Sequence, residues 1–235
     1  MREKLPTVIF ISIFTILVVS LVVGLGMHRG QNEVAAQLLS LAERAEKPDK
    51  PQKLTRAQIC YKCGEVDRKL CSGAYESGAA YQGKTITIDR SVLAAAAEKY
   101  RLMGYGNAEE RSTDYYLRLE TRALLAEREG IEITDAELEE EIELRVERAL
   151  SELYHEDTVL YLAGGGFTLS EALDCDREEL RKELAGNAWE ALVRAEFMEE
   201  RDLLVLTDQT KEDLRWEIEN RIATALKEDG VKAVK

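Results

Sequence analysis

The feature that most constrains this chain is an uncharged apolar run over residues 7–27, which follows the basic residues Arg2 and Lys4. A helix rises about 1.5 Å per residue, so this run matches the hydrocarbon core of a bilayer, which is about 30 Å thick. A secretory signal peptide has a shorter apolar region, about 7 to 15 residues, followed by a cleavage site with small residues. We therefore expect an uncleaved transmembrane anchor, with a cleaved signal peptide as the alternative.

Charged residues on either side of the run indicate its orientation. Arg2 and Lys4 precede it, whereas Arg29 follows it and is soon offset by Glu33. Positive charge favours the cytoplasmic side of a membrane. We expect a cytoplasmic tip at residues 1–6, and therefore a single-pass protein of the cell membrane whose remaining residues are extracytoplasmic.

The remaining residues divide into a stalk and a helical domain. Residues 28–82 begin with apolar residues at helical spacing, are interrupted by Pro48 and Pro51, and continue without a clear period. This pattern is typical of a stalk followed by a linker or small insert that carries cysteines. Residues 83–235 contain repeated helix signals. The formal net charge of −13 opposes binding to nucleic acid, so we expect no nucleic-acid partner.

Helix caps and periodic apolar residues predict an all-α domain. Asp89 can cap a helix that ends before Gly104, and Thr134 with Glu137 forms a capping box. The glycines at 164–166 separate two helices and suggest a hinge. With their caps, the expected helices cover residues 89–103, 108–129, 134–153, 168–173, 176–201 and 207–226, and at most one short extended segment precedes them at residues 83–89.

The order of these motifs resembles one known family. Residues 83–89 read Gly-Lys-Thr-Ile-Thr-Ile-Asp before a helix, and residues 124–142 contain a helix that ends in glycine, a hydrophobic pair, a threonine cap and an acidic helix. Residues 166–172 and 205–208 continue the pattern in family order. Over residues 85–228 the chain is similar to the extracytoplasmic SurA-like and PrsA-like foldases, in which this region is a helical chaperone domain.

The resemblance implies a membrane-anchored, ATP-independent chaperone that binds unfolded or secreted polypeptides. In that family the first helix of the domain packs against the helix that follows the main bundle. The strip Leu214, Ile218, Ile222 and Leu226 is therefore expected to lie against helices near the start of the domain, such as residues 92–103. The alternative function within the same fold is a helical scaffold that holds one defined partner in a cell-envelope complex.

The chain also departs from the family. Many of those foldases carry a parvulin-type prolyl isomerase domain, whose site usually contains a pair of histidines, but His28 and His155 lie in no such context. Nucleotide-binding loops, a zinc-protease motif and a hydrolase nucleophile elbow are missing from the sequence. We expect no enzyme activity, no catalytic residue and no cofactor.

Binding of unfolded segments needs apolar surface lined by adaptable side chains. Such side chains occur throughout the helical region, although aromatic residues and methionines at helical spacing usually belong to a core. No residue-level binding site is therefore predicted from them. The candidates are Tyr100, Leu102, Met103, Tyr105, Tyr115, Tyr116, Trp189, Phe197, Met198 and Trp216.

Four cysteines form the second chemical signal. Cys60 and Cys63 have the C-x-x-C spacing of zinc ribbons, redox motifs and local disulfides, with Cys71 eight residues further and Cys175 far away. Outside the cytoplasm, oxidation is the simplest outcome, and we expect at least one disulfide that involves Cys60 or Cys63. Cys71 and Cys175 are the other disulfide candidates. Zinc bound by Cys60, Cys63 and Cys71, with Cys175 or His155 as the fourth ligand, remains an alternative, as does a membrane-anchored thiol protein.

Overall fold

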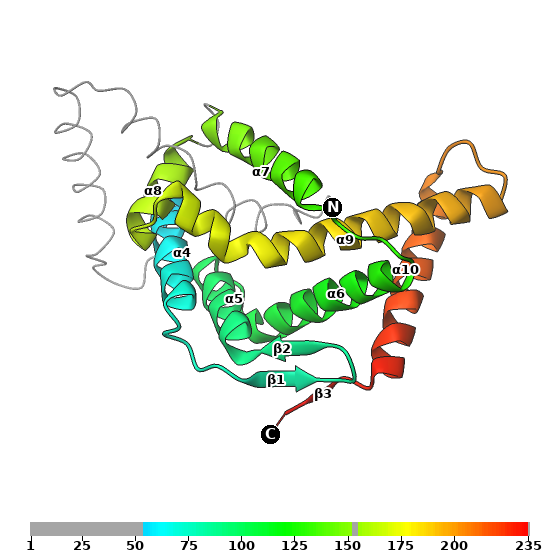
Figure 1. Cartoon of the computed structure of the whole chain (residues 1–235), viewed down its shortest axis with the longest axis horizontal. Helices are drawn as coiled ribbons and strands as arrows, with labels where there is room; N and C mark the ends of the chain where they lie inside the picture. The colour runs from blue at the N-terminus through cyan, green and yellow to red at the C-terminus, as the bar shows by residue number, and fades with distance from the viewer. Residues whose placement is uncertain (1–53, 152–154, 235) are drawn as a thin grey trace.

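The computed structural model describes residues 54–151 and 155–234. The apolar run at residues 7–27 lies outside them, and within them no helix is long and apolar enough to cross a bilayer. The labels used from here are those of Figure 1. The elements are α4 (Arg56–Cys71), β1 (Ala79–Gln82), β2 (Thr87–Asp89), α5 (Arg90–Leu102), α6 (Ala108–Arg128), α7 (Asp135–Leu150), α8 (His155–Gly165), α9 (Leu169–Glu200), α10 (Asp208–Asp229) and β3 (Lys232–Ala233).

The fold is built around the long helix α9. Figure 1 shows α6 beside it on one side and α7 on the other, with α10 crossing where α9 ends and α4, α5 and α8 gathered near its beginning. The β strands lie beyond α5 and α6, on the side away from α9. The prediction of a mainly helical domain is confirmed for the described residues.

Local capping explains where several helices begin. The Asp89 carboxylate accepts a hydrogen bond from the Ser91 amide at 2.8 Å and starts α5. The predicted capping box of Thr134 with Glu137 starts α7, and Thr168 starts α9 in the same way. Thr207 caps α10, at the predicted start of that helix. These signals depend on residues within one turn, which is why the sequence identifies them.

Helix α9 is continuous where the sequence analysis predicted a break, so the expected division at residues 174–175 is wrong. The three residues around the expected break, Asp174, Cys175 and Asp176, include neither proline nor glycine. Aspartate disfavours a helix only modestly. Leu173 and Leu180 both pack against α7 residues around Ile142. Packing on both sides of the supposed break therefore favours a single helix.

The segment assigned to a linker contains helix α4, which the sequence analysis missed. Thr55 and Gln58 form a capping box at its start. Its Gly64 approaches α8 so closely that a Cβ atom there would lie 2.0 Å from the Tyr161 carbonyl oxygen, and one on Gly164 would lie 1.9 Å from the Tyr61 carbonyl oxygen. The glycine run at residues 164–166 thus allows two helix backbones to touch, instead of forming only a hinge.

A three-stranded sheet with the order β2-β1-β3 replaces the single extended segment that was expected. Tyr81 pairs with Ile88 of β2 and with Ala233 of β3, both antiparallel. Asp229 secures the turn between β1 and β2: its carboxylate accepts hydrogen bonds from the amides of Thr85 and Ile86, at 2.8 and 3.1 Å. Strands this short carry little sequence pattern, and β3 pairs with a partner far away in the chain.

The apolar strip of α10 is buried, but its partners differ from those expected. Leu214 and Ile222 pack with Ala126 of α6 and with Trp189 and Val193 of α9. Only Leu226 also reaches the cluster that contains Val92 and Leu93 of α5. The strip therefore lies mainly against the middle helices of the domain, and the expected docking on residues 92–103 is wrong.

Candidate functional site

The cysteines are arranged differently from the prediction. Cys71 and Cys175 form a disulfide between α4 and α9, with their Cα atoms 6.0 Å apart, whereas Cys60 and Cys63 are free thiols. The expectation that Cys60 or Cys63 would be bridged is thus wrong. Both lie on the buried face of α4 and pack against Leu160 and other residues of α8. Burial raises the pKa of each thiol to about 12, so neither is a reactive thiolate at neutral pH.

A zinc site at these residues is not formed in the described part of the chain. No group of three or more histidine, cysteine, aspartate or glutamate side chains there is arranged to hold a metal ion. Cys71, the third proposed ligand, is occupied by its disulfide. His155 is exposed at the first residue of α8.

A buried polar cluster lies beside the disulfide. Lys99 forms an ion pair with Asp67, and the Tyr161 hydroxyl donates a hydrogen bond to the same carboxylate. Asp176 Oδ2 is shielded from solvent and has no hydrogen-bond partner among the described residues. Burial and then the Asp67 charge raise the pKa of Asp176 well above its usual range. Burial alone would lower the pKa of Lys99, but the Asp67 and Asp176 carboxylates outweigh it and raise that pKa.

Two tyrosines extend this polar interior toward α6. The hydroxyls of Tyr115 and Tyr116 both donate to the Glu179 carboxylate, at 2.8 Å each. Burial, followed by the Glu179 charge, raises the pKa of both hydroxyls above their usual range, so they remain protonated donors. These contacts join α6 to α9.

The candidate site is a groove where α6, α9 and α10 meet, with a volume of about 370 Å³. Its apolar residues come from α10 and from the loop that precedes it. Leu214 is almost fully buried, and Leu206 and Ile218 are partly buried against the same core. The residues that line it are Arg118, Glu190, Arg194, Leu206, Lys211, Leu214, Arg215, Ile218 and Glu219.

Some of the charged residues around this groove form ion pairs. Arg118 donates two hydrogen bonds to Glu219, both 2.6 Å long, and Arg122 Nε lies 2.9 Å from Glu190 Oε1. Lys211 pairs with Asp208 at 3.2 Å.

Arg194 on α9 and Arg215 on α10 are both exposed. Neither makes a hydrogen bond or ion pair with any residue in the ranges 54–151 and 155–234, although Arg215 contributes to lowering the pKa of Glu219.

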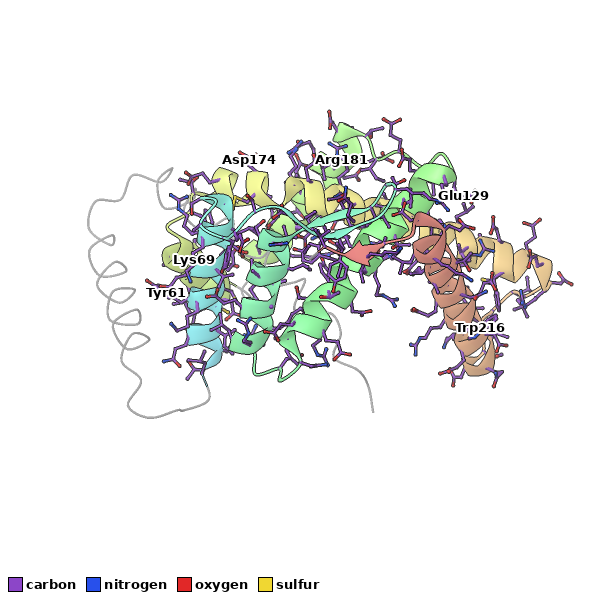
Figure 2. All side chains as sticks on the ribbon, turned by 90° about the horizontal axis from the view of Figure 1, so that it is seen from below. Tyr61, Lys69, Glu129, Asp174, Arg181 and Trp216 are labelled. Carbon is purple, nitrogen blue, oxygen red and sulfur yellow. A yellow bond between two sulfur atoms is a disulfide. The ribbon has the colours of Figure 1, made fainter. Side chains whose placement is uncertain are left out.

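Exposed apolar side chains adjoin the groove. Leu204 and Val205, in the loop between α9 and α10, are 95% and 75% exposed, and Trp216 of α10 is 66% exposed. Figure 2 shows Trp216 on the outer side of α10, at the end of the molecule away from Tyr61 and Lys69 of α4. The loop follows Asp202, a non-glycine residue with a φ angle of 51°. This end of the domain thus presents apolar surface that residues 54–151 and 155–234 leave exposed.

Most of the aromatic candidates from the sequence belong to the interior. Trp189 and Phe197 are core residues of α9, and Tyr116 is buried on α6. Tyr100 and Tyr105 stack edge to face near α5. Only Trp216 among the candidate aromatics is both large and well exposed.

The sequence analysis missed Leu204, although the run of four apolar residues at 203–206 between two helices was an available signal. It also missed Arg194 and Arg215. Nothing in their local sequence distinguishes them, because their lack of a partner depends on contacts across α6, α9 and α10.

The residues that line the groove combine apolar side chains with charges of both signs. Leu206, Leu214 and Ile218 form its apolar floor, and Leu204 and Val205 lie beside Leu206 in the chain. Arg194 and Arg215 contribute positive charge at its edge. Such a surface fits a segment of polypeptide with apolar side chains. Comparison of the chain with protein-family models, with curated proteins and with solved structures found no match.

Proposed function

We propose that this chain is a membrane-anchored extracytoplasmic chaperone that binds unfolded polypeptides without ATP, as the resemblance to SurA-like and PrsA-like foldases implies. The observation that carries the proposal is the exposed apolar surface of Leu204 and Val205, which directly precede the groove residue Leu206, with Trp216 as a further exposed apolar side chain on α10. Large exposed apolar side chains that lie together mark sites of interaction more often than single ones do.

The expected affinity suits a protein that must release its clients. Complete burial of an aliphatic side chain contributes about 1.5 to 3 kcal/mol, whereas association itself costs about 4 kcal/mol or more. A client that covers Leu204, Val205 and Trp216 therefore keeps at most about 5 kcal/mol of net binding free energy and is bound weakly, with a Kd on the order of 0.1 mM or above. The net charge of −13 keeps such a complex soluble.

The disulfide supports the extracytoplasmic part of the proposal. Cys71 and Cys175 are both exposed, and their disulfide is accessible to reductants. Disulfides persist in oxidising compartments and are rare in the cytosol. This feature agrees with the orientation expected from Arg2 and Lys4 at the start of the chain.

The test is suppression of aggregation by the full chain in nanodiscs. Several unrelated proteins are diluted from denaturant, and light scattering is followed at near-stoichiometric ratios. The variant Leu204→Ser/Val205→Ser/Trp216→Ser should lose most of the suppression. Leu144→Ser is the matched control, because Leu144 is 43% exposed on α7 and does not line the groove.

Circular dichroism confirms that each variant remains helical. Failure of the unaltered chain to suppress aggregation of any client would refute the chaperone proposal. Binding to a single envelope protein, with no effect on unrelated clients, would favour the scaffold function. Equal activity of the triple variant and the control would remove the groove as the binding site.

A further inference from the structure

We propose that the groove selects client segments in which acidic side chains accompany apolar ones, with Arg194 and Arg215 binding the carboxylates. This inference rests on the proposed chaperone function and names the chemistry of the segments it takes. The two arginines belong to different helices, α9 and α10, and line the same groove. A segment lying along it would contact positive charge from both helices.

Of the three arginines that line the groove, Arg118 is paired with Glu219, whereas Arg194 and Arg215 form no ion pair within the described residues. Acidic residues number 45 against 32 basic ones, so carboxylates are abundant. Many other arginines are paired, including Arg118, Arg145 and Arg221. Arg194 and Arg215 make no such pair with any residue from 54 to 151 or from 155 to 234.

Both acidic residues that line the groove already have basic partners. Glu219 lies one turn after Arg215, but both of its oxygens accept hydrogen bonds from Arg118. Glu190 lies one turn before Arg194 and pairs with Arg122. These pairs hold the neighbouring carboxylates in place and leave the two guanidinium groups with donors directed to solvent or to a ligand.

The apolar floor determines what must accompany the carboxylate. Leu206, Leu214 and Ile218 lie between the charged edges, and Leu204 and Val205 continue the apolar surface outside the groove. A free anion would leave this floor uncovered, whereas a purely apolar segment would leave the arginines without partners. An extended segment with both kinds of side chain satisfies both, because alternate residues point to opposite sides.

The electrostatic contribution is modest, because both arginines are exposed. Exposed ion pairs usually contribute about 0.2 to 1 kcal/mol each, so two together change affinity by about 2-fold to 30-fold. We expect an acidic peptide to bind on the order of 10-fold more tightly than a neutral one at low salt. The preference should decline as ionic strength rises.

The test measures binding of fluorescent peptides to the full chain in nanodiscs by anisotropy. The peptides share one apolar core and carry glutamate, glutamine or lysine at the flanking positions, and each is made once with an amidated and once with a free carboxyl end. Trp216 gives a second readout, because covering it should shift its emission to shorter wavelength while Trp189, 1% exposed, stays unchanged.

The variant Arg194→Gln/Arg215→Gln should abolish the preference for the glutamate peptide but retain binding of the glutamine peptide. Arg194→Glu/Arg215→Glu should reverse the preference in favour of lysine. The matched control is Arg148→Gln, since Arg148 is exposed on α7 and forms no side-chain ion pair within the described residues.

Three outcomes would overturn the inference. Equal affinity of the unaltered chain for the glutamate and glutamine peptides would refute it while leaving the chaperone function intact. A preference seen only when the carboxyl end is free would assign the arginines to a chain terminus instead of acidic side chains. If no peptide binds and aggregation is not suppressed, both the inference and the proposed function fail.

Discussion

Reduction of the disulfide between Cys71 and Cys175 should destabilise this protein without unfolding it. Both cysteines are exposed, so a reductant reaches them in the native state. The contacts that hold α4 in place remain after reduction, including the close packing of Gly64 on α8 and the ion pair between Asp67 and Lys99. The native fold should therefore persist, with a smaller free energy of unfolding.

The size of the effect follows from the length of chain that the disulfide closes. The two cysteines are 104 residues apart, and closing a loop of about 100 residues reduces the entropy of the unfolded chain by about 4.7 kcal/mol at 25 °C. Measured effects are usually nearer 2 to 4 kcal/mol, so we expect a loss of about 3 kcal/mol. This is a large share of the roughly 5 to 15 kcal/mol that stabilises a typical domain.

The assay is urea unfolding followed by the fluorescence of Trp189, which is 1% exposed and reports on the core. The Trp216→Phe background removes the exposed tryptophan. Reductant should lower the unfolding midpoint, and Cys71→Ser/Cys175→Ser should match the reduced protein with or without reductant. Equal midpoints for the oxidised and reduced protein would show that the disulfide does not constrain the unfolded chain as reasoned.

Counting thiols with an alkylating agent tests the same structure independently. The native oxidised protein should label at no cysteine, and the native reduced protein only at Cys71 and Cys175. Cys60 and Cys63 are buried, and their pKa of about 12 leaves almost no thiolate to react. All four should label after reduction in denaturant. Labelling of Cys60 in the native oxidised protein would contradict the packing of α4 on α8.

Three further predictions concern the interior of the domain. Burial and the Asp67 charge raise the pKa of Asp176 in the folded protein, so the stability that protonated Asp176 contributes is lost as pH rises through that pKa. Asp176→Asn should therefore raise Tm more near pH 8 than near pH 4 in differential scanning fluorimetry. An equal shift of Tm at both pH values would refute this. Gly64→Ala should lower Tm strongly, because its Cβ would meet the Tyr161 carbonyl oxygen, whereas Gly106→Ala, with no atom within 4 Å, should not. Ile222→Ala should cost about 2 to 5 kcal/mol in urea unfolding because Ile222 is a core residue, and the exposed Asn220→Ala should cost far less.

The features that could be predicted from the sequence are those set by neighbouring residues. Asp89, Thr134 and Thr168 were identified as helix caps because each acts on amides within the next turn. The burial of Leu214 and Ile222 agrees with their helical spacing in the same way. Such signals do not depend on how the helices are arranged in space.

The features that escaped prediction depend on distant parts of the chain. Helix α4 was missed because its apolar face includes Cys60, Cys63 and Gly64, residues that suggested a metal or disulfide segment. Their actual partner is α8, about a hundred residues later. The groove also depends on distant parts of the chain, because it forms only where α6, α9 and α10 meet. No local pattern records which arginines remain unpaired there.

The Asp229 contacts with the turn between β1 and β2 determine when the domain can be completed during synthesis. The amides of Thr85 and Ile86 emerge from the ribosome long before Asp229, which accepts their hydrogen bonds from more than 140 positions later. Strand β3 arrives later still, so the edge of β1 stays open until then. During synthesis this edge of β1 therefore remains unpaired. An unpaired strand edge is prone to pair with strands of other chains. The last turn of α10 and strand β3 together therefore complete a domain whose first strands were synthesised long before them.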